Sequence, residues 1–138
     1  MCTSIDELKT KNFWKARGRK DKTWIWAYKF YNGEGKLPHT YFQDGQVYIG
    51  WNKSDRLSKG IATSEYDWGI DEGVHVCVNI KELKDWLLCC SHKPQVAKVK
   101  CFKKDFVACD AHGNAVFMKY FLPKAEYDKV VKNMKQGE

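Results

Sequence analysis

The sequence contains no apolar run that approaches the ~18 residues that a membrane-spanning helix requires. Its first residues, Met1–Glu7, carry acidic side chains where a secretory signal would carry basic and then apolar ones. It has no internal repeat and no low-complexity linker that would mark a domain boundary. We therefore expect one domain over residues 1–138, located in the cytoplasm, with no membrane partner.

The sequence also lacks the common local signatures of enzymes. It contains no G-x-S-x-G turn, no phosphate-binding glycine loop and no dinucleotide fingerprint. Acidic residues do gather around Trp68, at Glu65, Asp67, Asp71 and Glu72. Because an acidic loop is usually only solvated, acid–base catalysis there is the less favoured interpretation. We expect no catalytic residue and no cofactor.

C-x-x-C pairs, the usual trace of a zinc site, are absent as well. Histidine and cysteine do occur at short spacing, in the pairs His75/Cys77, Cys90/His92 and Cys109/His112. Zinc bound by such pairs, or a thiolate activated by a nearby imidazolium, is an alternative to buried free thiols. Six cysteines in a chain that stays inside the cell favour free thiols. We expect no metal and no disulfide, with Cys101 a small buried hydrophobic residue.

Apolar and basic residues, by contrast, are abundant. The chain is 43% hydrophobic and 14% aromatic, and 24 Lys+Arg against 17 Asp+Glu give a net charge of +7. That apolar content is far above what a disordered chain carries, and the length suits a domain with one core. The basic balance favours anionic partners such as nucleic acid or an acidic protein.

Hydrophobic periodicity and turn residues predict nine elements in chain order. The first is a helix at 5–12, begun by a Ser4–Glu7 capping box, and it is followed by strands at 23–31, 40–42 and 46–51. After a loop at 52–72 come a strand at 74–78, a helix at 80–90, strands at 95–102 and 115–122, and a helix after Pro123. Asp44-Gly45 is expected to turn the hairpin of the second and third strands. The fold class is α+β: a single domain with an antiparallel or mixed sheet of about five to six strands and about three helices.

Two of these strands show clear alternation. From Thr23 to Tyr31, one face is aromatic, with Trp24, Trp26, Tyr28 and Phe30. From Gln95 to Phe102, the small apolar residues are expected to point inward, and Lys98 and Lys100 outward. A strand with one polar face favours an antiparallel or mixed sheet.

The most concentrated charge lies near the amino terminus. Residues 9–22 carry seven Lys or Arg and one Asp, and the rings of Phe13 and Trp14 lie among them. Such a basic arm, residues 1–22 with its helix, suits phosphate neutralisation combined with base stacking. The predicted binding residues are Trp14, Lys15, Arg17, Arg19, Lys20, Lys98 and Lys100. The alternative is a solvated arm with ordinary edge-strand lysines.

Part of the chain resembles a small uncharacterised domain of phage and bacterial proteins. The resemblance lies in Gly73–Asn79 followed by Lys-Glu-Leu-Lys-Asp-Trp, in Val99–Val107 and in Ala115–Phe117, and it spans roughly residues 24–122. It implies a phage-type accessory protein in a host cell, and it supplies no activity.

The chain is also similar, more faintly, to the ADP-ribosyltransferase fold. The strand Val74–Val78, the helix from Ile80, the strand ending at Phe102 and the segment Ala115–Pro123 follow the order of that fold. The resemblance implies an acidic residue near the last strand, but Asn114–Phe117 contains none. If the fold is related, we expect NAD chemistry to be lost or rebuilt.

Three functional hypotheses follow. The first is a non-enzymatic binding protein that docks a basic and aromatic surface on nucleic acid or on an acidic host protein, including a defence component that it inhibits. The second is an ADP-ribosyltransferase-like enzyme that uses NAD. The third is a structural subunit of a phage particle, with the Trp24–Phe30 strand at a subunit interface. The oligomeric state stays open.

Overall fold

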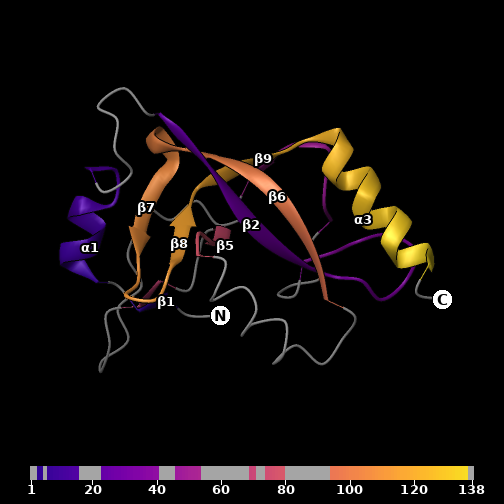
Figure 1. Ribbon diagram of the computed structural model, residues 1–138, viewed down its shortest axis with the longest axis horizontal. Helices are drawn as coiled ribbons and strands as arrows, with labels where there is room; N and C mark the ends of the chain where they lie inside the picture. The colour runs from indigo at the N-terminus through magenta and orange to yellow at the C-terminus, as the bar shows by residue number, and fades with distance from the viewer. Residues whose placement is uncertain are drawn as a thin grey trace.

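The computed structural model describes residues 3–4, 6–15, 23–40, 46–53, 69–70, 74–79 and 94–136. A seven-stranded antiparallel sheet dominates it, with the strand order β3-β9-β6-β2-β5-β8-β7, beside a two-stranded pair of β1 and β4 (Figure 1). The strands are β1 Thr3–Ser4, β2 Trp24–Asn32, β3 Gly50–Lys53, β4 Gly69–Ile70, β5 Val74–Cys77, β6 Pro94–Phe102, β7 Phe106–Cys109, β8 Asn114–Phe117 and β9 Lys119–Leu122. The helices are α1 Glu7–Asn12 and α3 Lys124–Gln136, with a short 3-10 turn, η2, at Lys103–Asp105.

The longest strands, β2 and β6, form the centre of the sheet. They pair over nine residues each, from Trp24 opposite Phe102 to Asn32 opposite Pro94. Directly opposed residues of an antiparallel pair share a face. Ile25 and Ala27 are buried together with Cys101 and Val99 on one face. The alternation predicted for both strands is therefore confirmed.

The buried face continues into one connected core under the helices. Val130 and Met134 of α3 lie in the same cluster as Leu122, Tyr120 and Val99. In Figure 1, α3 lies beside β6 toward one end of the sheet, while α1 lies beside β7 at the other. The helix predicted after Pro123 is confirmed.

The amino terminus differs from its prediction. Ser4 does not cap a helix, because its backbone pairs with Gly69 in the β1–β4 strand pair. Asp6 caps α1 instead, and its carboxylate accepts a hydrogen bond from the Lys9 N–H at 2.8 Å. The helix buries no residue of its own. Phe13, immediately after it, is buried and anchors it to the core.

The carboxyl-terminal half contains more strands than expected. The strand predicted at 115–122 is two strands, because Met118 leaves the ladder and its N–H donates to the Asp105 carbonyl at 2.8 Å. As a result β8 pairs with β5 and β7, while β9 pairs with β3 and β6. The strand β7 was not predicted as a separate element, since the 3-10 turn that separates it from β6 spans only three residues.

The described parts of the loop predicted at 52–72 belong to strands. Asn52 and Lys53 belong to β3, and Gly69-Ile70 forms β4. The buried Asn52 side chain accepts from the Tyr48 N–H at 2.9 Å and donates to the carbonyls of Tyr48 and Gly50 at 2.7 and 3.2 Å. The Asn52 side chain thereby fixes the backbone at residues 48–50, where the chain enters β3.

The fold class is thus broadly α+β, with seven strands in the main sheet rather than five or six, and two helices among the described residues. Several predictions concern segments outside the described residues. They are the helix at 80–90, the Asp44-Gly45 turn, the Cys90/His92 pair and the acidic residues Glu65, Asp67, Asp71 and Glu72.

Two tyrosines supply a polar contact inside the core. The hydroxyls of Tyr31 and Tyr120 lie 2.8 Å apart, and both side chains are buried. We expect Tyr31→Phe to lower the free energy of unfolding by about 1–3 kcal/mol, because it leaves the Tyr120 hydroxyl buried without this partner. The double variant Tyr31→Phe/Tyr120→Phe should recover part of that loss in urea denaturation. Strictly additive losses would contradict a coupled pair.

A lysine also lies on the core side of β2. Lys29 is half-buried, and its Nζ donates to the His75 carbonyl at 3.0 Å. Burial lowers the pKa of Lys29 to about 8, although nearby Cys101 acts in the opposite direction. Burial also disfavours the charged form of the Cys101 thiol, and it therefore raises the pKa of that thiol to about 12.

The pKa of Lys29 makes its effect on stability depend on pH. Below about pH 8 both the folded and unfolded protein carry the charge, and the folded protein bears its desolvation cost. As pH rises toward 10.5, the folded protein loses this proton before the unfolded chain does, so that cost is relieved. We therefore expect the Lys29→Met variant to have a higher free energy of unfolding than the parent at neutral pH. The difference should disappear near pH 10, about two units above the folded pKa. Urea titrations at the two pH values measure both free energies. An equal gain at both pH values would contradict this effect of Lys29 burial.

Candidate functional site

The residues predicted for binding fall into three groups. Arg17, Arg19 and Lys20 lie outside the described residues. Trp14 and Lys15 lie just after α1, where Lys15 is exposed and Trp14 is half-buried. Lys98 and Lys100 lie on β6, on the face opposite the core.

The Trp14 ring packs against the core. Its centroid lies 5.2 Å from that of Phe13, 5.9 Å from Phe106 and 6.4 Å from Phe117, in edge-to-face contacts. Its indole N–H is buried without a hydrogen-bond partner among the described residues. This ring contributes to packing, and the exposed tryptophans of the described residues lie on the strands of the sheet.

The exposed tryptophans lie together on the sheet face opposite the core. We name this surface the aromatic–lysine face. Its members come from β2, β3, β6, β9 and η2: Trp24, Trp26, Trp51, Lys98, Lys100, Phe102, Lys104, Lys119 and Phe121. Their common orientation follows from the strand register. Trp51 pairs with Phe121, Phe121 with Lys100, and Lys100 with Trp26, in one row across four strands.

The tryptophans of this face are exposed to solvent. Trp24, Trp26 and Trp51 have relative exposures of 36%, 40% and 44%. Trp24 and Trp26 meet edge to face with centroids 5.5 Å apart, and the Trp51 centroid lies 5.4 Å from those of both Phe102 and Phe121. Because large exposed aromatic groups are uncommon on a monomer surface, a patch of them points to a binding site.

A lysine lies over each exposed indole. The Nζ of Lys100 is 4.7 Å from the Trp24 ring centroid and 5.2 Å from that of Trp26. Lys98 Nζ lies 5.0 Å from the Trp26 ring, and Lys119 Nζ lies 4.7 Å from the Trp51 ring. Each such cation–π contact contributes about 0.5–1 kcal/mol at an exposed site. The contacts hold the ammonium groups between the rings, so positive charge and flat apolar surface alternate.

No carboxylate belongs to the strands that form this face. β2, β3, β6 and β9 contain no Asp or Glu in their described residues. The nearest acid in sequence, Asp105, is the last residue of η2, and its side chain is buried. The face is therefore positively charged as well as aromatic, which favours an anionic partner with flat apolar groups.

The sequence predicted two of the nine members of this face as binding residues, and it predicted Trp24 and Trp26 only as the aromatic face of a strand. Lys98 and Lys100 were predicted, while Trp51, Lys119 and Phe121 were not assigned to the site. The sequence pattern for Trp51, Lys119 and Phe121 is a short alternation of buried and more exposed positions at Trp51–Lys53 and Lys119–Leu122. That pattern indicates a shared face only once the pairing of β3 with β9 is known.

The described pairs, His75/Cys77 and Cys109/His112, do not belong to a metal cluster within the described part of the chain. Among the described residues, no group of three or more His, Cys, Asp or Glu side chains converges. Cys77 and Cys109 are buried, and the Cys77 Sγ donates to the Asn79 carbonyl at 3.0 Å. Cys101 is fully buried, as expected.

The chain was compared with family models, curated proteins and solved structures, and none of them matches it. Neither described helix is both long and apolar enough to cross a bilayer.

The geometry predicts how individual tryptophans respond to an anionic quencher. Iodide should be attracted by the lysines of the face and should quench Trp26 strongly, whereas Trp14 is shielded by its aromatic neighbours. We expect Trp26→Phe to lower the Stern–Volmer slope for iodide, and Trp14→Phe to raise it slightly, because a shielded emitter is removed. Equal slopes in the two variants would contradict this arrangement.

Proposed function

We propose that this protein is a non-enzymatic nucleic-acid-binding protein that holds single-stranded nucleic acid on its aromatic–lysine face. The observation that carries the proposal is the row of exposed indoles, each beside a lysine, across four strands without an acid. The resemblance to phage-type accessory proteins suits such a role, in which occupying a nucleic acid is itself the activity.

Stacking is the first contribution that the face offers. Nucleobases of a single strand present both π-faces, and each base stacked on an aromatic side chain contributes about 1–3 kcal/mol. Trp26 and Trp51 lie on separate strands at the two ends of the Trp51–Phe121–Lys100–Trp26 row. Bases stacked within a duplex are not available in this way, which favours a single strand as the ligand.

The lysines supply the second contribution. Lys98, Lys100, Lys104 and Lys119 all lie within 6.0 Å of a ring centroid of the face. Phosphates that flank a stacked base would meet these ammonium groups, and each neutralised phosphate releases condensed counterions. An acidic protein would satisfy the charge but would leave the indoles without flat partners, so nucleic acid is the better match.

Two substitutions on the face test this proposal in fluorescence anisotropy titrations with short labelled single-stranded oligonucleotides. Trp26→Ala should weaken binding about tenfold, because a stacked base loses its platform. Lys100→Glu should also weaken binding and should reduce the slope of log affinity against log salt by about 0.7 for each phosphate that is no longer neutralised.

The matched control is Lys132→Glu, which makes the same charge change at an exposed position of α3. It should leave affinity and salt slope close to those of the parent. Binding that is insensitive to salt, or equally weakened by Lys132→Glu, would reject the face as the binding site. Preferred capture of an acidic protein over the oligonucleotide would favour a protein partner.

A second candidate, a particle subunit, is favoured by exposed apolar residues next to the face. Tyr48 and Ile49 are 55% and 48% exposed, and they adjoin Trp51. Self-association through this edge would cover them. Sedimentation at increasing protein concentration separates the two candidates, because a chain that remains monomeric while binding oligonucleotide excludes the subunit role.

A further inference from the structure

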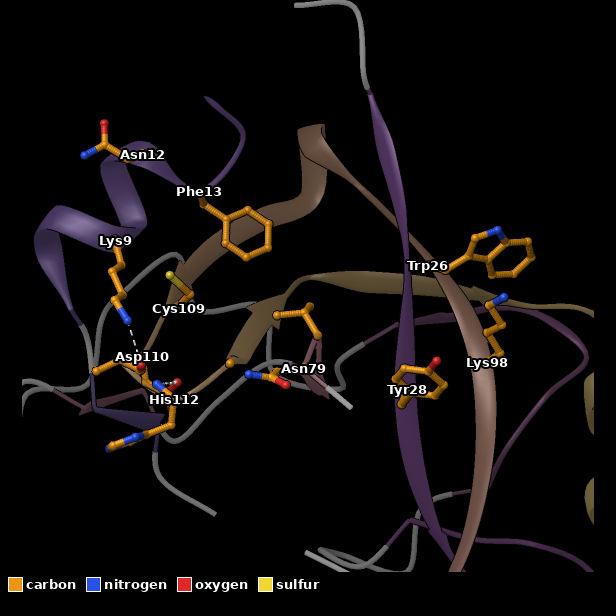
Figure 2. A pocket seen from close by; sticks show the side chains of 13 residues that line it. Lys9, Asn12, Phe13, Trp26, Tyr28, Asn79, Lys98, Cys109, Asp110 and His112 are labelled. Carbon is orange, nitrogen blue, oxygen red and sulfur yellow. Dashed lines mark hydrogen bonds between the residues drawn. The ribbon is translucent and has the colours of Figure 1, made fainter. Parts of the chain in front are cut away.

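The aromatic–lysine face ends in a pocket of about 800 Å³ between α1, the turn at 109–113 and the strands β2 and β6. Figure 2 shows Lys9 and Phe13 on one side of it, and Trp26, Tyr28 and Lys98 on the other. Small-molecule sites usually occupy about 300–1,000 Å³, so the pocket is large enough for a nucleotide.

The wall of the pocket formed by the turn is held firmly. The Asp110 carboxylate accepts from the backbone N–H groups of His112 and Asn114 at 2.8 and 2.9 Å, and from the Asn114 side chain at 2.8 Å. The Val78 N–H donates to the Gly113 carbonyl at 2.7 Å. Gly113 has a φ of +103°, and a Cβ there would lie 2.5 Å from the Asn79 Cβ. The turn and the end of β5 therefore approach closely only because residue 113 is glycine.

The helix α1 is fixed to the same turn. Thr10 Oγ1 accepts from the Cys109 N–H at 3.0 Å, and the Asp6 N–H donates to the Cys109 carbonyl at 2.9 Å. Lys9 Nζ donates to the Ala111 carbonyl at 2.8 Å, as the dashed line in Figure 2 marks. A pocket whose wall is fixed in advance avoids part of the ordering cost of binding.

The lining offers the groups that a nucleotide requires. The rings of Trp26 and Tyr28 provide apolar surface for a base, and Lys9 and Lys98 bring positive charge for a phosphate. Polar side chains that can pair with a base edge come from the rim of the pocket: Asn12, Asn79 and His112.

The pocket is continuous with the aromatic–lysine face. Trp26 and Lys98 belong to both, and Lys98 Nζ lies 5.0 Å from the Trp26 ring. Tyr28 follows on the same side of β2 and pairs directly with Lys98. We propose that this pocket binds one nucleotide unit of the strand held on the face, with its base inserted beside Tyr28. This inference rests on the proposed function.

Titration with the four ribonucleoside 5′-monophosphates and with inorganic phosphate tests the pocket, using amide chemical shifts of the full chain. We expect saturable shifts at Asn79, Ala111 and Gly113, with at least one nucleotide binding more tightly than phosphate. Tyr28→Ala should lower that affinity about tenfold through lost stacking, whereas Tyr28→Phe should retain it.

A matched pair on α1 tests the charge at the pocket. Lys9→Ala should weaken nucleotide binding, while Lys11→Ala, an exposed lysine of the same helix outside the lining, should not. Trp51→Ala, at the far end of the face, should weaken oligonucleotide binding but leave the mononucleotide affinity unchanged. Thermal unfolding of each variant shows whether the fold is retained.

The outcomes separate the two proposals. Oligonucleotide binding that depends on Trp26 and Lys100, without mononucleotide shifts at the pocket, would overturn the pocket and keep the face. Mononucleotide binding without oligonucleotide binding would overturn the inference that the pocket serves a bound strand. Absence of binding by either ligand would reject the proposed function itself.

Discussion

The register between β2 and β6 determines both the core and the candidate binding face. Nine consecutive pairs place Ile25 opposite Cys101 and Ala27 opposite Val99, and all four side chains are buried. Because successive residues of a strand point to opposite faces, the same register must place Trp26 opposite Lys100 on the other side. A slip by one residue would bury lysines and expose the core, so packing on one face fixes the chemistry of the other.

The strongest local patterns predicted the structure well. The alternation of β2 and β6 is visible within each strand, and the closing helix begins beside a proline and has an apolar stripe. What could not be predicted depends on distant partners. Ser4 and Asp6 both have side chains that cap helices, and only the pairing of Ser4 with Gly69 decides between them. The division of 115–122 at Met118 likewise depends on a hydrogen bond to Asp105.

The site was harder to predict than the fold for a related reason. Trp14 was predicted as a binding residue because it lies among clustered basic residues in the sequence. In the structure, its ring packs edge to face against Phe106 and Phe117 in the core. The exposed indoles come from strands separated by long stretches of chain, and they join only through the β6–β9 and β3–β9 pairings. With no matching family or structure, the resemblances to a phage-type domain and to ADP-ribosyltransferases stay predictions.

The face and the pocket differ in the kind of recognition that they can provide. Stacking on Trp26 or Trp51 and attraction to lysines are available to every base and phosphate, so they supply affinity with little sequence preference. The pocket differs, because Gly113 and the Asp110 hydrogen bonds hold its polar rim in place. A fixed rim penalises a base whose donors and acceptors do not match, since mismatched polar groups lose their hydrogen bonds on binding. If the protein binds a strand as proposed, any base preference should therefore arise at the pocket, while the open sheet would set how strongly the rest of the strand is held.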